Sequence, residues 1–287
     1  MLDLRIKEYL SRVGIRKISE LDTALIETYG QEEGENHIDQ LTKLFDLSEE
    51  RLMYGSKDMP YLHRQEELVD YLNQSIQMSI LAASFYDYVF FRRVMDYLLK
   101  YERYWTGDIL DIGCGNGILS CFLAMLHPES SVTGLDLSRN AVSVAEELAG
   151  SLSAENVHFA CAKESGGRTY DTLFSCRTVH ENVVWRPLIE ESKAAPLSTE
   201  EQTKRHEEYA KTLSAFVKPQ GYLISVERYE DDSAYAGFLC ALTGAGLCTV
   251  KGTRMQFSCK NGDEMAAFQA SIFQFLPLCD GKDILKK

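Results

Sequence analysis

The sequence predicts an α/β protein with a doubly wound, mostly parallel sheet behind a helical N-terminal region. Short apolar runs alternate with helical patterns from residue 108 to residue 226. A turn with glycines at 113, 115 and 117 directly follows the first of these runs. Near the end, Asn261-Gly262 separates two strand-like stretches, which is typical of a hairpin. Strands that alternate with helices indicate a parallel sheet with helices on both faces.

The first hundred residues have the pattern of helices joined by short polar turns. Ile6 and Leu10 fall at helical spacing, the polar stretch 32–36 predicts a break, and one long helix is expected over 75–101. We therefore divide the chain into an N-terminal helical cap, residues 1–100, and an α/β domain, residues 101–287.

Seven strands are expected in the second part. Ser198-Thr-Glu-Glu201 is a capping box, so a helix should begin near Thr199 and run to about residue 217. An alanine-rich helix is expected over 234–245. The predicted strands are 108–112, 131–135, 157–162, 172–179, 222–226, 248–258 and 265–275, the last two forming a C-terminal antiparallel hairpin.

Composition narrows the function classes. The chain has 287 residues, 45% of them hydrophobic, which suits a globular core. Its formal net charge of -13 works against binding nucleic acid, which needs clustered Lys and Arg. The eight cysteines form no C-x-x-C pair and the histidines show no ligand spacing, so no metal site is expected. Charges at the N-terminus and the lack of a long apolar stretch predict a cytoplasmic protein without membrane association.

The glycine-rich turn identifies the kind of ligand. A dinucleotide site has the spacing G-x-G-x-x-G, whereas this turn is G-x-G-x-G, with Asp111 two residues before Gly113. A carboxylate there would repel a diphosphate and attract a cationic amino group. Asp136 ends the second strand about twenty residues later, where an acid can accept both ribose hydroxyls. Together the two acids predict a nucleoside that carries an amino acid.

At these residues the chain resembles the class I S-adenosylmethionine-dependent methyltransferase family, from about residue 100 to residue 277. Asp-Ile-Gly-Cys-Gly-Asn-Gly at 111–117 matches the first motif of that family, and Gly-Leu-Asp-Leu-Ser at 134–138 is similar to its second. The segments 170–181 and 218–225 resemble its fourth and fifth strands. The resemblance implies a Rossmann-like fold with a seven-stranded sheet. It also implies methyl transfer from S-adenosylmethionine, with S-adenosylhomocysteine as the product.

By that resemblance, the turn holds the methionine end of the cofactor and Asp136 holds the ribose. The third strand ends without the family's usual acid, so adenine recognition would fall to backbone groups or to Glu164. The cofactor-binding residues expected are Asp111, Gly113, Cys114, Gly115, Asn116, Gly117, Asp136, Leu137, Ala162, Lys163 and Arg177.

His180, at the end of the fourth predicted strand, is the expected catalytic base, because a near-neutral pKa suits proton transfer. The alternatives are that His180 orients the loop that follows it or contacts the cofactor. Arg177 is expected either to bind a carboxylate of the cofactor or of the acceptor, or to face the surface at the end of the strand. Trp185 is a candidate for the wall of the acceptor site. The acceptor is expected to be a small molecule bound partly by the N-terminal helices. The alternatives are a protein or peptide acceptor, a non-catalytic S-adenosylmethionine-binding partner or sensor, and a nicotinamide oxidoreductase.

Overall fold

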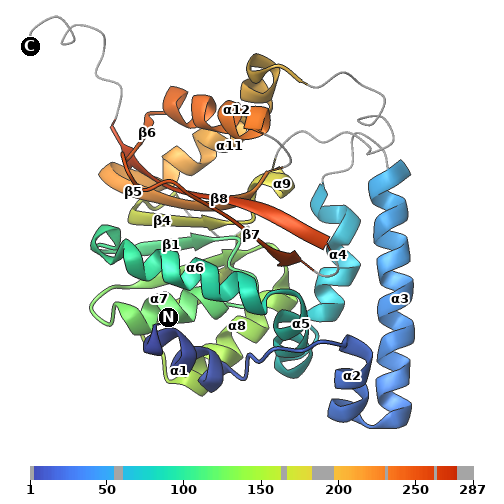
Figure 1. Cartoon of the computed structure of the whole chain (residues 1–287). Helices are drawn as coiled ribbons and strands as arrows, with labels where there is room; N and C mark the ends of the chain where they lie inside the picture. The colour runs from blue at the N-terminus through green and yellow to red at the C-terminus, as the bar shows by residue number, and fades with distance from the viewer. Residues whose placement is uncertain are drawn as a thin grey trace, which may run out of the picture.

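The computed structural model describes residues 3–54, 61–162, 167–182, 197–229, 232–261 and 264–276 (Figure 1). The helices are α1 (Leu4–Val13), α2 (Leu21–Tyr29), α3 (Gln31–Tyr54), α4 (Tyr61–Leu72), α5 (Ile76–Tyr86), α6 (Tyr88–Lys100), the 3-10 helix η1 (Glu102–Tyr104), α7 (Ile118–Leu126), α8 (Arg139–Leu152), α9 (Val179–Asn182), α11 (Thr199–Phe216) and α12 (Asp232–Gly244). The strands are β1 (Ile109–Ile112), β2 (Val132–Asp136), β3 (Val157–Cys161), β4 (Tyr170–Cys176), β5 (Val217–Arg228), β6 (Leu247–Thr249), β7 (Met255–Asn261) and β8 (Glu264–Phe275).

One sheet joins all eight described strands. Seven of them follow the order β3-β2-β1-β4-β5-β8-β6, and β7 pairs with β8 outside this order. The first five of these are parallel, and β8 runs antiparallel to β5. The chain lays β2 and β3 on one side of β1 and then returns to place β4 on the other side. The strand order thus reverses between β1 and β4, and in open α/β sheets this is where ligands bind. The predicted doubly wound α/β fold is confirmed.

Neighbouring residues of each strand point to opposite faces of the sheet, and helices cover both faces, so both sets of side chains are buried. Phe174 of β4 packs in the cluster that α1, α6 and α7 cover, whereas its neighbour Leu173 packs with α11 and α12. Ile224 and Leu223 of β5 divide in the same way. Figure 1 shows α6, α7 and α8 on one side of the sheet and α11 and α12 on the other.

The N-terminal helices differ from the sequence expectation in two places. The single helix expected over 75–101 is two helices, because the chain turns at Asp87 between α5 and α6. The break expected at 32–36 is also wrong, since α3 runs through it without interruption. The predicted capping box is confirmed: the Ser198 hydroxyl accepts the Glu201 backbone N–H, and α11 begins at Thr199.

The end of the chain forms one strand more than expected. The stretch 248–258 divides into β6 and the beginning of β7, because Gly252 adopts a positive φ of 80° and turns the chain between them. Both strands pair antiparallel with β8, and β7 is off the main strand order. The described sheet therefore has eight strands where seven were expected.

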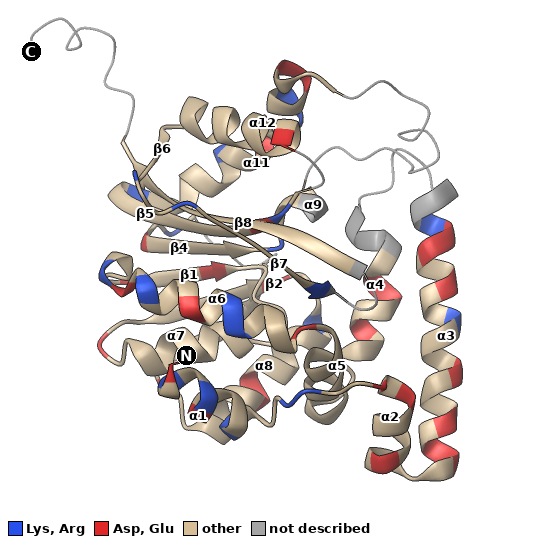
Figure 2. Ribbon diagram, in the orientation of Figure 1, with Lys and Arg blue, Asp and Glu red and all other residues tan. Residues whose placement is uncertain are grey.

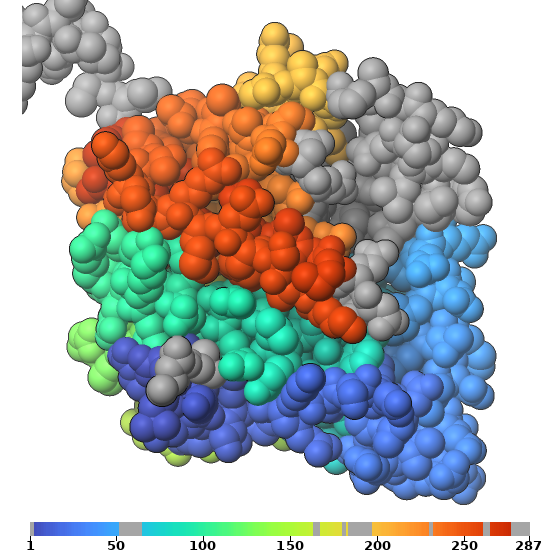
Figure 3. All heavy atoms as spheres, viewed as in Figure 1, coloured from blue at the N-terminus to red at the C-terminus, as the bar shows by residue number. Residues whose placement is uncertain are grey.

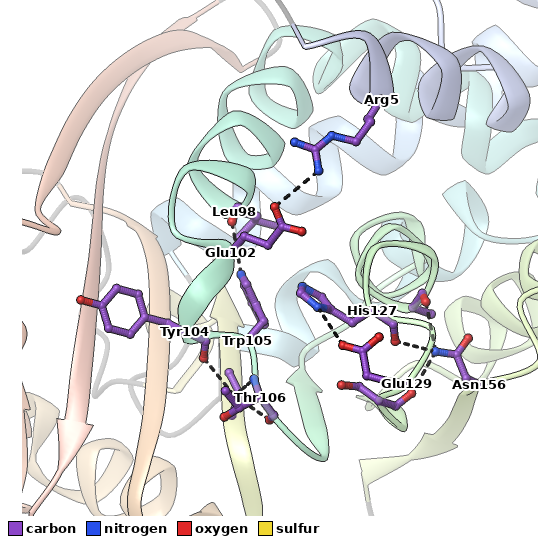
Figure 4. A network of polar contacts seen from close by, with 12 residues as sticks. Arg5, Leu98, Glu102, Tyr104, Trp105, Thr106, His127, Glu129 and Asn156 are labelled. Carbon is purple, nitrogen blue, oxygen red and sulfur yellow. Dashed lines mark hydrogen bonds and ion pairs between the residues drawn. The ribbon is translucent and has the colours of Figure 1, made fainter.

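Polar contacts fasten the N-terminal helices to the amino ends of the strands (Figure 4). The Trp105 indole N–H donates to the carbonyl of Leu98 at 3.3 Å, and its ring packs edge-on against Phe174. The Asn156 amide donates to the carbonyl of Ala124 in the last turn of α7 and to those of His127 and Ser130 in the connection from α7 to β2. The first helices form a continuous surface with α6 and the strands above it (Figure 3). Within the described ranges, no helix combines the length and hydrophobicity that a bilayer crossing requires.

Candidate functional site

A cleft of about 1250 Å³ lies at the carboxyl ends of β1, β2 and β4. One wall is the glycine-rich turn with the ends of the strands, and the other is built from α3, α4, α5 and the start of α6. A site for one small molecule usually measures about 300–1,000 Å³, so this cleft is larger than a typical site for one ligand. The expected cofactor residues that line it are Asp111, Gly113, Cys114, Gly115, Asn116, Asp136, Leu137 and Arg177.

The glycine-rich turn is shaped to receive a ligand at Gly115. All three glycines have positive φ, at 72°, 52° and 75° for Gly113, Gly115 and Gly117. A Cβ on Gly113 would lie 2.5 Å from the Thr178 methyl, and one on Gly117 would lie 2.6 Å from Ala145. At Gly115 nothing lies within 4 Å of that position. Other side chains of the protein thus occupy the space beside Gly113 and Gly117, whereas the space beside Gly115 is open to the cleft.

The carboxylate of Asp136 is held by backbone donors on both sides. One oxygen accepts the Gly115 N–H at 2.8 Å and the other accepts the Ser138 N–H at 2.9 Å. Burial raises the pKa of this half-buried acid, and the backbone hydrogen bonds oppose that rise. Each carboxylate oxygen retains a lone pair, so the pair can accept two adjacent hydroxyls. The group is therefore fixed in position to accept a pair of adjacent hydroxyls.

Asp111 is buried in the cleft wall, with 2% of its surface exposed. Its carboxylate accepts the Ser120 hydroxyl at 2.5 Å. Burial raises its pKa to about 7, and the charge of Asp136 adds to the rise. A cation beside it would stabilise the ionised form, as an opposite charge does for any buried acid. This geometry suits an ammonium group.

The N-terminal helices bind directly to both cofactor motifs. The Asn116 amide donates to the Ser79 hydroxyl of α5 at 2.9 Å. The Ser138 hydroxyl donates to the carboxylate of Asp70 of α4 at 2.7 Å. These bonds join residues 37 and 68 positions apart, and no sequence signal marked Asp70 or Ser79 for this role. The second wall of the cleft is thus fixed relative to the first.

Comparison with known proteins agrees with this geometry. Residues 106–231 match the family model of a methyltransferase domain. The matched segment contains the glycine-rich turn, Asp136 and the end of β4. This segment of the chain is therefore similar to a methyltransferase domain.

Short segments resemble curated proteins. A phycocyanin operon protein of Pseudanabaena tenuis is 49% identical over 39 residues, which are 14% of this chain and 37% of that protein. The ribosomal RNA small subunit methyltransferase G of Thermotoga neapolitana is 41% identical over 58 residues, 20% of this chain and 25% of that enzyme. The chain therefore matches well under half the length of either relative. A solved S-adenosylmethionine-dependent methyltransferase of Aquifex aeolicus is 18% identical, with a TM-score of 0.41, over 63% of this chain and 90% of that one.

Arg177 has a defined place in the cleft. It follows β4 with a positive φ of 62°, and its guanidinium donates to Asp87 at 2.7 Å. The same group lies 3.9 Å from the ring centre of Phe90 in α6. Arg177 therefore connects the end of β4 to the junction of α5 and α6. The surface-facing alternative does not fit this half-buried position.

The remaining predicted residues are divided by their placement. Gly117 is buried at the start of α7, and Ala162 packs with the cluster under α11 and α12, so neither lines the cleft. Lys163, Glu164 and Trp185 lie outside the described residues. His180 lies in the short helix α9, and only its backbone is described. No group of three or more His, Cys, Asp or Glu side chains in the described part of the chain is arranged to hold a metal.

Proposed function

We propose that this methyltransferase acts on a small molecule held between the glycine-rich turn and helices α3 to α6. The cleft carries the proposal, because it extends beyond the contacts of Asp111 and Asp136 to a second wall of helices. That wall includes Phe45, Tyr86 and Phe91, whose aromatic surfaces suit an organic acceptor. The N-terminal region, residues 1–100, would then be the acceptor-binding part of the enzyme.

The charge of this wall supports the same acceptor class. Glu49 of α3, Glu66 of α4 and Asp70 of α4 line the cleft, and Figure 2 shows acidic residues along α3. Asp87 faces Arg177 and offsets its charge. Carboxylates on the acceptor side disfavour a phosphodiester chain, which needs Lys and Arg. A neutral or cationic small molecule fits better than a nucleic acid.

Each predicted residue has a separate role in this proposal. S-adenosylmethionine supplies an electrophilic methyl group when it is bound. Asp111 binds its ammonium group and Asp136 its ribose hydroxyls. Adenine contacts would come from the end of β3, where Cys161 lines the cleft and Ala162 does not, and from Lys163. The protein then contributes mainly by positioning the two reactants, which lowers the entropic part of the barrier.

His180 is the proposed general base for an acceptor that must lose a proton. It follows Thr178, which lines the cleft, by two residues. A positioned base contributes roughly 10²–10⁴-fold to a rate. The alternative role, a cofactor contact, predicts a loss of cofactor affinity on substitution.

Ligand-dependent melting is the first test. S-adenosylmethionine and S-adenosylhomocysteine should each raise the melting temperature, and NAD should not, because binding to the folded state alone stabilises it. Release of S-adenosylhomocysteine is then measured with a small-metabolite extract and with a protein fraction. Turnover with the protein fraction alone would favour the protein or peptide acceptor. Cofactor binding with no turnover in either would favour a non-catalytic binding protein.

A further inference from the structure

A buried carboxylate lies beneath the cofactor cleft and has no role in the steps above. Glu227 is the next-to-last residue of β5 and is fully buried, with 0% of its surface exposed. One carboxylate oxygen accepts the Ser175 hydroxyl of β4 at 2.7 Å. The other accepts the backbone N–H of Val179, the first residue of α9, at 3.1 Å. Glu227 thus ties β5 to the segment that follows β4.

Three hydroxyl groups form a chain that ends on this carboxylate. Tyr209 of α11 donates to Thr178 at 2.5 Å, and Thr178 lies 2.7 Å from the Ser175 hydroxyl. Each hydroxyl has one hydrogen to donate. Thr178 also lies 3.3 Å from the same carboxylate oxygen, to which its hydroxyl can donate directly. An ionised carboxylate can only accept, so the Ser175 hydroxyl donates to Glu227, and the Thr178 hydroxyl donates either to Ser175 or to Glu227 itself.

The chain reaches the cofactor motif through Thr178. A Cβ on Gly113 would lie 2.5 Å from the Thr178 methyl, so this methyl packs directly against the first glycine of the turn. Thr178 also lines the cleft. Rotation of its side chain would remove either the hydroxyl bond or the methyl contact. We infer that Glu227 is a positioning residue for S-adenosylmethionine binding, acting through Ser175 and Thr178 on the turn at Gly113.

Charge and burial make this position sensitive to protonation. No Lys or Arg side chain in the described ranges forms an ion pair with Glu227, and burial raises its pKa to about 7. Among the described side chains, the titratable groups near Glu227 are Cys176, Tyr209 and Tyr229. Burial raises the pKa of Cys176 and of Tyr229 well above the usual values, so both stay neutral near pH 7. Protonation of Glu227 replaces an acceptor by a donor at the end of the chain.

The inference rests on cofactor binding at the turn and is independent of the acceptor. It is tested by calorimetric titration of S-adenosylhomocysteine into the full chain, with melting temperatures measured in parallel. Glu227→Gln places an amide N–H against either the Ser175 hydroxyl or the Val179 N–H. We expect its Kd to rise about tenfold, the scale of one hydrogen bond to a charged group. Its Kd should also vary less between pH 6 and pH 8 than that of the wild type, in which Glu227 adds to the titration of Asp111.

Two tyrosines provide a matched pair of variants. Tyr209→Phe removes the hydroxyl at the head of the chain and should raise the Kd about threefold. Tyr235→Phe removes a hydroxyl that is equally buried and lies 2.6 Å from Ser271, away from the cleft, and should leave the Kd unchanged. Unchanged affinity in folded Glu227→Gln, or equal losses in all three variants, would overturn the inference. If the wild type itself fails to bind S-adenosylhomocysteine, the cofactor assignment falls and this inference falls with it.

Discussion

Asp111→Asn should stabilise the folded protein and weaken cofactor binding at the same time. The pKa of Asp111 rises from 3.8 to about 7 because the side chain is buried. One pKa unit corresponds to about 1.4 kcal/mol, so keeping this group ionised costs the folded state on the order of 4 kcal/mol. Asparagine has nearly the same shape and still accepts the Ser120 hydroxyl. We expect the free energy of unfolding to rise by about 2–4 kcal/mol at pH 8.

The sign of the pH dependence provides a second check. A raised pKa means that the folded state binds the proton more tightly than the unfolded state does. Its contribution to stability is therefore complete below pH 3.8 and is lost as the pH rises to about 7. The advantage of Asp111→Asn should be largest above pH 7 and fade as the pH falls toward 4.

Urea unfolding at pH 8 and pH 4, with calorimetric titration of S-adenosylhomocysteine, measures both effects. Loss of the charge should weaken binding by about 1.5–3 kcal/mol. Asp108→Asn is the control, because Asp108 forms a part-exposed ion pair with Arg168 at 2.8 Å and does not line the cleft. It should change stability by less than about 1 kcal/mol and leave binding intact. A destabilised Asp111→Asn protein that binds normally would refute the reasoning.

Asp136→Ala should weaken S-adenosylhomocysteine binding by about 1.5–3 kcal/mol, and unchanged calorimetric affinity would show that the ribose lies elsewhere. Gly117→Ala places a methyl 2.6 Å from Ala145 at a φ of 75° and should lower the free energy of unfolding by about 1–3 kcal/mol in urea titrations. Gly115→Ala meets open space, so in the same titrations it should cost less stability while it reduces cofactor affinity. His180→Ala should lower kcat roughly 10²–10⁴-fold and spare the Kd for S-adenosylhomocysteine; equal losses in both would make His180 a cofactor contact.

The cofactor side of the cleft could be predicted from sequence because its information is local. The acid and the three glycines lie within seven consecutive residues, and the backbone there needs glycine for its conformation. Asp136 follows in the next strand. Burial on both faces also made the strands recognisable as short apolar runs. Local pattern was therefore enough for the turn and the central sheet.

The helical wall of the cleft could not be predicted, because its contacts join distant parts of the chain. The Asp70–Ser138 bond spans 68 residues and the Arg177–Asp87 pair spans 90. The break at Asp87 was missed because the apolar spacing continues across it. The sequence does place an acid, Glu227, directly after the apolar run 222–226. Its buried partners, however, can be identified only in the structure.

The apolar core is continuous across residue 100. Ile6 and Leu10 of α1 and Leu98 of α6 belong to the same buried cluster as Phe122 of α7 and Ile272 of β8. A fragment that begins after α6 would keep every motif of the cofactor site and expose the apolar face that those helices cover. Such exposed surface favours aggregation. The first hundred residues and the sheet should therefore be kept together in any shortened or hybrid version of the protein.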